Sequence, residues 1–288
     1  MRYLLFLGIV LALLCQSAAF ARNGPPRPLT FVELWNNVAY YDTNLEKKGF
    51  ASFLGRFEGK VGLNLFNSPL QVYGVYYSAL SQSPDYWDNS LFAGGGVRYK
   101  PFESYLGSGW QDEWIRDVKI FAESLSASYF KNAASAEANK NTDTRYGLEI
   151  WHEWNLDRAD ESLPWGELWA NLSYRETNFG WEDFSDYVLY FQPKIGMHLG
   201  KGIGAYLRAD LTTSGKGGPD YYFLNVADYG IGIRFEPWRK GGGEKDIFRK
   251  FKMFAEVLGV SYLKDKPEDP AKEVDMDVRL GIDFSIGR

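Results

Sequence analysis

The chain has 288 residues, of which 45% are apolar and 24% are charged, a composition that excludes wholesale disorder. Its 30 glycines and 12 prolines are too few for a collagen-like or linker protein. The formal net charge of −5 argues against a surface that binds the nucleic acid backbone, so we expect no nucleic acid partner. The aromatic fraction of 17% is high and favours a protein whose surface contacts two different solvents.

The chain begins with the pattern of a secretory signal peptide. Arg2 supplies a positive charge, residues 4–14 include an apolar run, and Ala19 and Ala21 give the small-residue spacing of a cleavage site. We expect residues 1–21 to be removed and residues 22–288 to form the mature domain; a buried first helix is the alternative. Cleavage would remove Cys15, the only cysteine, which excludes disulfides and cysteine-based catalysis.

Beyond residue 21 the dominant pattern is an alternation of apolar and polar residues with a period of two. In residues 166–176, for example, Leu168 falls on one face and Glu167 on the other, and residues 203–213 and 273–287 alternate in the same way. Segments of about ten residues are longer than most strands of soluble sandwiches. The sequence therefore predicts an all-β, single antiparallel transmembrane barrel with an apolar face toward lipid and a charged face toward the lumen.

Twelve segments carry this pattern, an even number as expected for a bacterial single-chain barrel, and counts of ten or fourteen stay open. They are residues 29–42, 53–66, 70–81, 90–101, 117–130, 143–156, 166–176, 186–200, 203–213, 222–236, 251–264 and 273–287. With the N-terminus in the periplasm, residues 200–202 form a tight periplasmic turn and the longer polar loops face outward. The periplasmic connections 102–116 and 237–250 are unusually long.

An internal repeat links the two halves of the chain. The eleven residues from Lys119 match the eleven from Lys252 at seven positions, and residues 96–102 resemble residues 232–238. The copies lie about 135 residues apart, which corresponds to six predicted strands. Duplication of a six-stranded half would explain both matches. The alternative is that barrel strands in general share such residue patterns.

The same motifs resemble those of a known family. The strand Gly-Val-Arg-Tyr-Lys-Pro-Phe at residues 96–102 precedes a charged connection and a Lys-x-Phe-Ala-Glu-x-Leu strand that begins at Lys119. This order resembles the C-terminal barrel domain of the bacteriophage N-four adsorption protein A family, over about residues 49–288. Similar barrels end the outer-membrane exporters of cellulose and poly-N-acetylglucosamine. The resemblance implies an outer-membrane location and polysaccharide passage with periplasmic export partners, and it supplies no catalytic residues.

The last predicted strand carries a second, independent motif. Four of its residues follow the polar-x-Gly-x-x-aromatic-x-apolar form of the C-terminal signal read by the barrel-assembly machinery: Arg279, Gly281, Phe284 and Ile286. Together with the signal peptide, this motif predicts insertion into outer-membrane lipid.

Alternation also predicts which side chains line the lumen. The candidate site residues are Trp151, Trp169, Tyr206, Arg175, Lys194, His198, Arg208, Asp210 and Arg234. Inward tryptophans are either a track on which sugar rings stack or the filling of a narrow barrel. Inward acids and bases nearly balance, which predicts weak ion selectivity and permits either a hydrated channel for neutral glycans or a lumen closed by pairing.

Few features of the sequence indicate an enzyme or a cofactor-binding site. His152 falls on the lipid face without a serine at two-residue spacing, unlike the Ser–His arrangement of an outer-membrane phospholipase. The glycine runs 94–96 and 241–243 do not open helices, and no His/Cys/Asp cluster has metal spacing, so we expect no cofactor or metal. The leading function is a conduit for polysaccharide or oligosaccharide. The alternative is a structural or receptor barrel, for phage or another partner, with a plugged lumen.

The terminal motif generates a first prediction. Phe284→Ala removes the aromatic group of the predicted assembly signal, so the variant should accumulate unassembled in the periplasm. Heat-modifiable migration and membrane fractionation measure this directly. Normal assembly of Phe284→Ala would contradict the assignment.

Overall fold

The computed structural model describes ten stretches of the chain. They are residues 28–43, 51–65, 68–82, 88–103, 114–130, 142–156, 162–177, 184–238, 251–270 and 273–286. The predicted signal peptide and most of the connections 102–116 and 237–250 lie outside the described residues.

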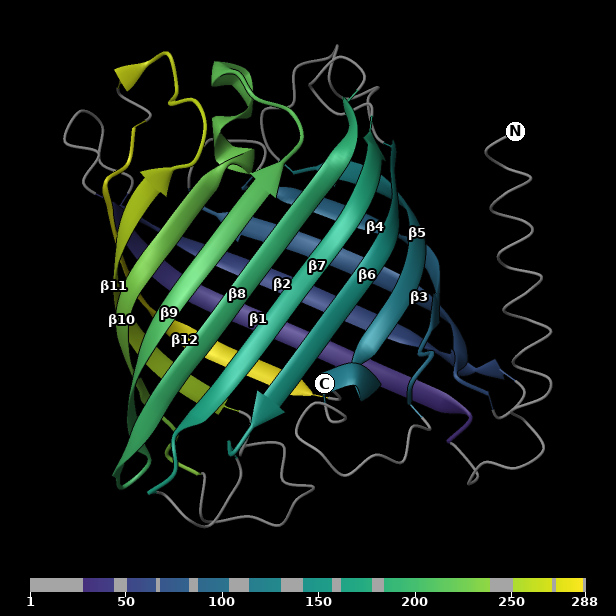
Figure 1. Cartoon of the computed structure of the whole chain (residues 1–288), viewed down its shortest axis with the longest axis horizontal. Helices are drawn as coiled ribbons and strands as arrows, with labels where there is room; N and C mark the ends of the chain where they lie inside the picture. Colours follow the sequence, from purple (N-terminus) through teal and green to yellow (C-terminus); the bar gives the residue numbers. More distant parts are fainter. Residues whose placement is uncertain are drawn as a thin grey trace.

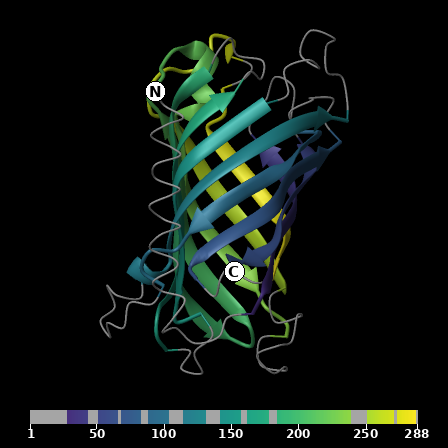
Figure 2. The same cartoon turned by 90° about the vertical axis from the view of Figure 1, so that its right-hand side faces the viewer.

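The described residues form a closed barrel of twelve antiparallel strands, in which each strand pairs with its chain neighbours and β1 pairs with β12 (Figures 1 and 2). The strands are β1 (Thr30–Thr43), β2 (Ala51–Asn64), β3 (Leu70–Ser81), β4 (Ser90–Tyr99), β5 (Val118–Tyr129), β6 (Thr142–Trp154), β7 (Trp165–Thr177), β8 (Phe184–Gly200), β9 (Ile203–Ser214), β10 (Val226–Phe235), β11 (Phe251–Tyr262) and β12 (Met276–Ile286). The predicted fold class and strand count are confirmed, and most bounds agree within three residues.

One predicted strand begins later than expected. Residues Pro219–Leu224 form a short 3-10 helix, η2, and β10 starts only at Val226. The proline removes a backbone donor that a strand would need, and the side chain of Asn225 binds the carbonyl oxygens of Lys216 and Tyr221 at 3.0 and 3.1 Å. These local bonds keep the segment folded as a loop.

The outer wall of the barrel is apolar. Ile231, Leu280 and Leu207 are 63%, 62% and 59% exposed, although each lies in the middle of a strand. An apolar surface of this extent around a closed barrel is suited to lipid and not to water. Within the part of the chain described here, we find no helix with the length and hydrophobicity needed to span a membrane.

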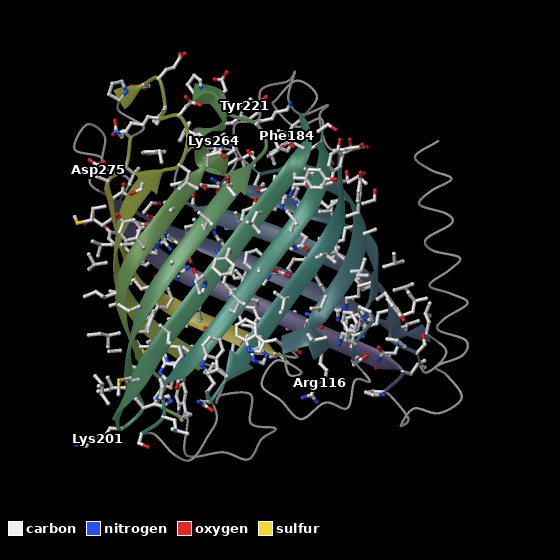
Figure 3. The ribbon with its side chains drawn as sticks, viewed as in Figure 1. Arg116, Phe184, Lys201, Tyr221, Lys264 and Asp275 are labelled. Carbon is white, nitrogen blue, oxygen red and sulfur yellow. The ribbon has the colours of Figure 1, made fainter. Side chains whose placement is uncertain are left out.

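The two ends of the barrel differ. The turn end carries the tight turn at Lys201, where residues 200, 201 and 202 all have positive φ of 92°, 52° and 77°. At the opposite, loop end, η2 packs over Phe184, and Lys264 reaches the carbonyl oxygen of Gly215 at 3.2 Å. Figure 3 shows Lys201 and Arg116 at the turn end and Phe184, Tyr221, Lys264 and Asp275 at the loop end. The tight turn predicted at residues 200–202 is confirmed.

The repeat seen in the sequence extends over all twelve strands. The eleven residues Glu33–Thr43 in β1 and Glu167–Thr177 in β7 are identical at six positions. Distant contacts are repeated as well: the Tyr73 hydroxyl donates to Glu123 at 2.9 Å, and the Tyr206 hydroxyl donates to Glu256 at 2.7 Å. The strands β1–β6 and β7–β12 therefore form two equivalent halves.

Close backbone approaches repeat in the same positions, including across the closure of the barrel. A Cβ on Gly147 would lie 2.0 Å from the carbonyl oxygen of Leu172, and one on Gly281 would lie 2.6 Å from that of Val38. Gly147 lies where β6 pairs with β7, and Gly281 lies at the corresponding place where β12 pairs with β1. Residue patterns common to all barrel strands would not produce the same contacts between distant residues in both halves, so the structure favours duplication.

The apolar wall generates a matched pair of substitutions in β8. Ile195 is 49% exposed on the outer face, whereas Gln192 faces the lumen. Ile195→Arg places a charge against lipid at a cost of roughly 2–4 kcal/mol near the midplane and should impair folding into lipid vesicles. Gln192→Arg should fold like the unmodified protein, and equal folding yields would show that the two faces are misassigned.

Candidate functional site

The candidate functional site is a cavity of about 260 Å³ inside the barrel. Its walls come from β1, β2, β6–β9, β11 and β12. The aromatic lining residues are Trp35, Tyr41, Trp151, Trp169, Tyr190 and Phe254. The charged lining residues are Arg56, Glu58, Glu167, Lys194, Arg208, Lys252, Arg279 and Asp283.

Aromatic rings cover two facing walls of this cavity. On one wall Trp151 pairs with Trp169 across β6 and β7, and Trp169 stacks on Tyr190 at 5.8 Å between ring centroids. On the other wall Trp35 in β1 occupies the position equivalent to Trp169. Because β1 and β7 are six strands apart in a twelve-stranded barrel, the two tryptophans project from opposite sides.

Ion pairs fill the part of the lumen formed by the first half. The Lys60 ammonium lies 3.5, 3.7 and 3.4 Å from carboxylate oxygens of Glu58, Glu123 and Glu149. The Arg98 guanidinium binds the Glu33 carboxylate through both terminal nitrogens. The side chains of Lys60 and Arg98 are only 5% and 2% exposed, and such burial is tolerated because each cation meets carboxylates.

The second half holds a corresponding network. The Glu167 carboxylate lies 2.7, 2.9 and 3.7 Å from nitrogens of Lys252, Arg234 and Lys194. Here β11 and β10 meet β7 across the lumen, as β4 meets β1 in the first half, whereas Lys194 lies on the neighbouring strand β8 directly opposite Glu167.

A second cluster of that half centres on two arginines. Arg208 binds Glu256 at 2.8 Å and Asp210 at 2.6 Å. Arg279 binds Asp228 at 2.8 Å and Asp210 at 3.2 Å, so Asp210 joins the two arginines. Bonds between strands that are not neighbours therefore narrow the lumen around the aromatic cavity.

The structure places the predicted lumen residues on the inner face. Trp151, Trp169, Lys194 and Arg208 line the cavity itself. Tyr206, Asp210 and Arg234 are buried in the surrounding networks. Arg175 lies over the Tyr190 ring at 5.1 Å, and His198 packs 6.1 Å from the Trp165 ring.

The residues of the predicted assembly signal lie in β12, which closes the barrel against β1. Arg279 also belongs to the lumen network, and Gly281 allows the close approach to β1 described above. Phe284 and Ile286 pair with Asn36 and Leu34 of β1. Recognition of this strand by the assembly machinery stays a prediction.

Four lining residues were not predicted from the sequence: Trp35, Tyr41, Arg56 and Tyr190. The segment that contains Trp35 alternates poorly, so its inner face was not evident. The match between Glu33–Thr43 and Glu167–Thr177 is the signal that could have identified it, because it aligns Trp35 with Trp169.

His152 lies outside the lumen, as we expected, but it is not exposed to lipid, contrary to our expectation. It is only 5% exposed because Trp114, from the connection before β5, covers it at 4.8 Å between ring centroids. Its Nδ1 lies 2.7 Å from a carboxylate oxygen of Asp117. The contact is local packing at the turn end, which alternation within β6 could not reveal.

A second cavity of about 410 Å³ opens beside His152 at this end. Its lining is of mixed charge, from Lys100, Glu103, Arg116, Asp117, Lys119, His152 and Glu153. Burial lowers the pKa of Lys100, an effect that Glu103, 3.5 Å away, partly offsets. Among the described residues no group of three or more His, Cys, Asp or Glu side chains is arranged to hold a metal ion.

The shared anion of the second network generates a stability prediction. Glu167→Gln leaves Lys194, Arg234 and Lys252 without their common carboxylate and should lower the free energy of unfolding by about 3–5 kcal/mol. Glu153→Gln is the control, because the Glu153 carboxylate accepts a 3.3 Å hydrogen bond from Trp151 and lies beyond salt-bridge distance of the described lysines and arginines, so its loss should cost under about 1 kcal/mol. Urea unfolding in lipid vesicles measures both, and similar losses would contradict the role given to Glu167.

Comparison with known proteins gives likeness only to solved barrels. No family model and no curated protein matches the chain. The NanC porin is 9% identical with a TM-score of 0.43, covering 88% of this chain and 100% of that chain. An outer membrane channel from Pseudomonas putida F1 is 8% identical with a TM-score of 0.41, covering 92% and 100%. The KdgM porin is 13% identical with a TM-score of 0.35, covering 88% and 99%.

Proposed function

We propose that this chain is a non-enzymatic outer-membrane channel through which a saccharide passes. The observation that carries the proposal is the cavity inside the barrel, with Trp35 on one wall and Trp151 and Trp169 on the facing wall. Flat indole rings pack against the apolar faces of pyranose rings, and a lumen that passes sugars needs such surfaces along its path.

The polar groups of the cavity complement its aromatic walls. Gln192, Asn37 and Ser285 also line it, and their amide and hydroxyl groups suit the hydroxyls of a sugar. A ligand that is apolar on its ring faces and polar at its edges fits this combination better than a lipid or a simple ion does.

The location follows from the outer wall together with the predicted signal peptide. An apolar exterior around a closed barrel requires a membrane, and bacterial barrels of this kind stand in the outer membrane. With the N-terminus in the periplasm, the turn end with Lys201 faces the periplasm and the loop end with η2 faces outward. Export of a polysaccharide, with periplasmic export proteins at the turn end, rests on the family resemblance.

A second candidate is a receptor barrel with a plugged lumen. It is favoured by the ion pairs that cross the interior, such as Lys60 to Glu149 at 3.4 Å and Lys252 to Glu167 at 2.7 Å. In that case the outer loops would bind the partner and the lumen would pass no solute.

Conductance separates the two candidates. Protein reconstituted in planar bilayers should show discrete current steps that cellotetraose, a neutral oligosaccharide, interrupts transiently. Trp169→Ala removes one stacking surface and should shorten these interruptions while the steps persist. Trp238→Ala is the control, because Trp238 lies beyond β10 and outside the cavity. A correctly folded barrel that carries no current would contradict the channel and support the receptor.

A further inference from the structure

Two lumen arginines stand apart from the ion-pair networks. Nine inward lysines and arginines of the described strands lie within salt-bridge distance of a carboxylate: Lys60, Arg98, Lys119, Arg145, Lys194, Arg208, Arg234, Lys252 and Arg279. Among the described residues Arg56 in β2 and Arg175 in β7 have no such partner. Arg56 lines the cavity and is exposed toward it.

Each of these arginines instead lies over a tyrosine ring. Arg56 is 5.9 Å from the ring centroid of Tyr41, and Arg175 is 5.1 Å from that of Tyr190. The repeat aligns Tyr41 with Arg175 and Arg56 with Tyr190, so the two pairs occupy equivalent places with arginine and tyrosine exchanged. The lumen therefore holds two arginine–tyrosine pairs, one on each of two facing walls.

A tyrosine ring stabilises a guanidinium but leaves its hydrogen-bond donors unused. The ring attracts the cation through its electron-rich face and offers no acceptor in the plane of the five N–H groups. The Nε of Arg175 is buried and has no hydrogen-bond partner within the part of the chain that the structure describes. The guanidinium of Arg56 is exposed in the cavity wall, so its donors can bind oxygen atoms of a ligand, and the planar fork of an arginine matches a carboxylate.

The carboxylates near Arg56 already have other donors. Asp283 accepts a 2.6 Å hydrogen bond from the Asn37 amide, and Glu58 lies 3.5 Å from the Lys60 ammonium. Neither comes within salt-bridge distance of Arg56. Among the described residues, Arg56 in the cavity wall and Arg175 over the Tyr190 ring that lines it are thus the lumen cations without a carboxylate partner.

We propose that the saccharide of this channel is acidic, with carboxylates that bind Arg56 and Arg175 on their separate walls while its rings contact the cavity tryptophans. This inference rests on the proposed function and names the substrate class for the same cavity. It differs from the expectation of a weakly selective lumen for neutral glycans. That expectation counted inward charges, whereas the paired charges cancel locally and the unpaired arginines set the preference.

Two matched probes test the proposal. Cellotetraose and its C6-oxidised glucuronate counterpart share one backbone and differ in the carboxylates. Binding to detergent-solubilised full-length protein is followed by tryptophan fluorescence, which does not require conduction. The acidic probe should bind at least about tenfold more tightly than the neutral one, as expected for a charge-assisted hydrogen bond.

The variants Arg56→Gln and Arg175→Gln should each reduce this preference, and the double variant should abolish it while neutral binding changes less than about twofold. Lys201→Gln, which removes a cation from the turn end, is the control and should leave the preference intact. If Arg56→Gln does not fold by heat-modifiable migration, Arg56→Lys keeps the charge without the fork and should reduce the preference partly.

The outcomes separate this inference from the proposed function. Equal affinity of the two probes for the unmodified protein, a preference that survives in the double variant, or an undiminished preference in Arg56→Lys would overturn the acidic substrate. A channel that conducts and is blocked equally by both probes would keep the proposed function and reject the inference. Selective binding of the acidic probe by a barrel that carries no current would support the inference and reject the channel.

Discussion

The pairing of charges inside a wall that faces lipid is the constraint on which this barrel depends. With apolar side chains such as Ile231 and Leu280 turned outward, the polar side chains of every strand turn inward. An unpaired charge there costs several kcal/mol, so carboxylates such as Glu167 gather several cations around them. The same pairs tie strands that are not neighbours and determine how much open space the lumen retains.

The two equivalent halves explain how such a network is built. Each half supplies its own tyrosine–glutamate bond, Tyr73 to Glu123 and Tyr206 to Glu256, and its own arginine–aspartate contact within the last strand of the half. A half with six strands leaves two unpaired edges, and the second half covers both. Both halves thus use the same arrangement to pair their edges and to compensate their buried charges.

The sequence was sufficient for the barrel but not for its site. Period-two alternation identifies strands and faces because side-chain direction in a strand is a local property, and it placed Trp151, Trp169 and Arg208 correctly on the inner face. Which inward charges pair is not local: Lys252 and Glu167 are 85 residues apart and meet only because the barrel closes. For that reason a charge count could not distinguish Arg56 from the neutralised cations.

The two halves differ most clearly in the residues that line the cavity. The repeat keeps the compensated charges, Glu33 with Glu167 and Glu123 with Glu256, and it changes the cavity wall. At one pair of equivalent positions Trp151 stands where the other half has Ser285, and both line the cavity. The difference is local, because β1 and β11 supply three aromatic lining residues, as β6, β7 and β8 together do. At that position the proposed ligand would meet an indole ring on one side and a hydroxyl group on the other, so the two sides of the cavity are not equivalent despite the repeat.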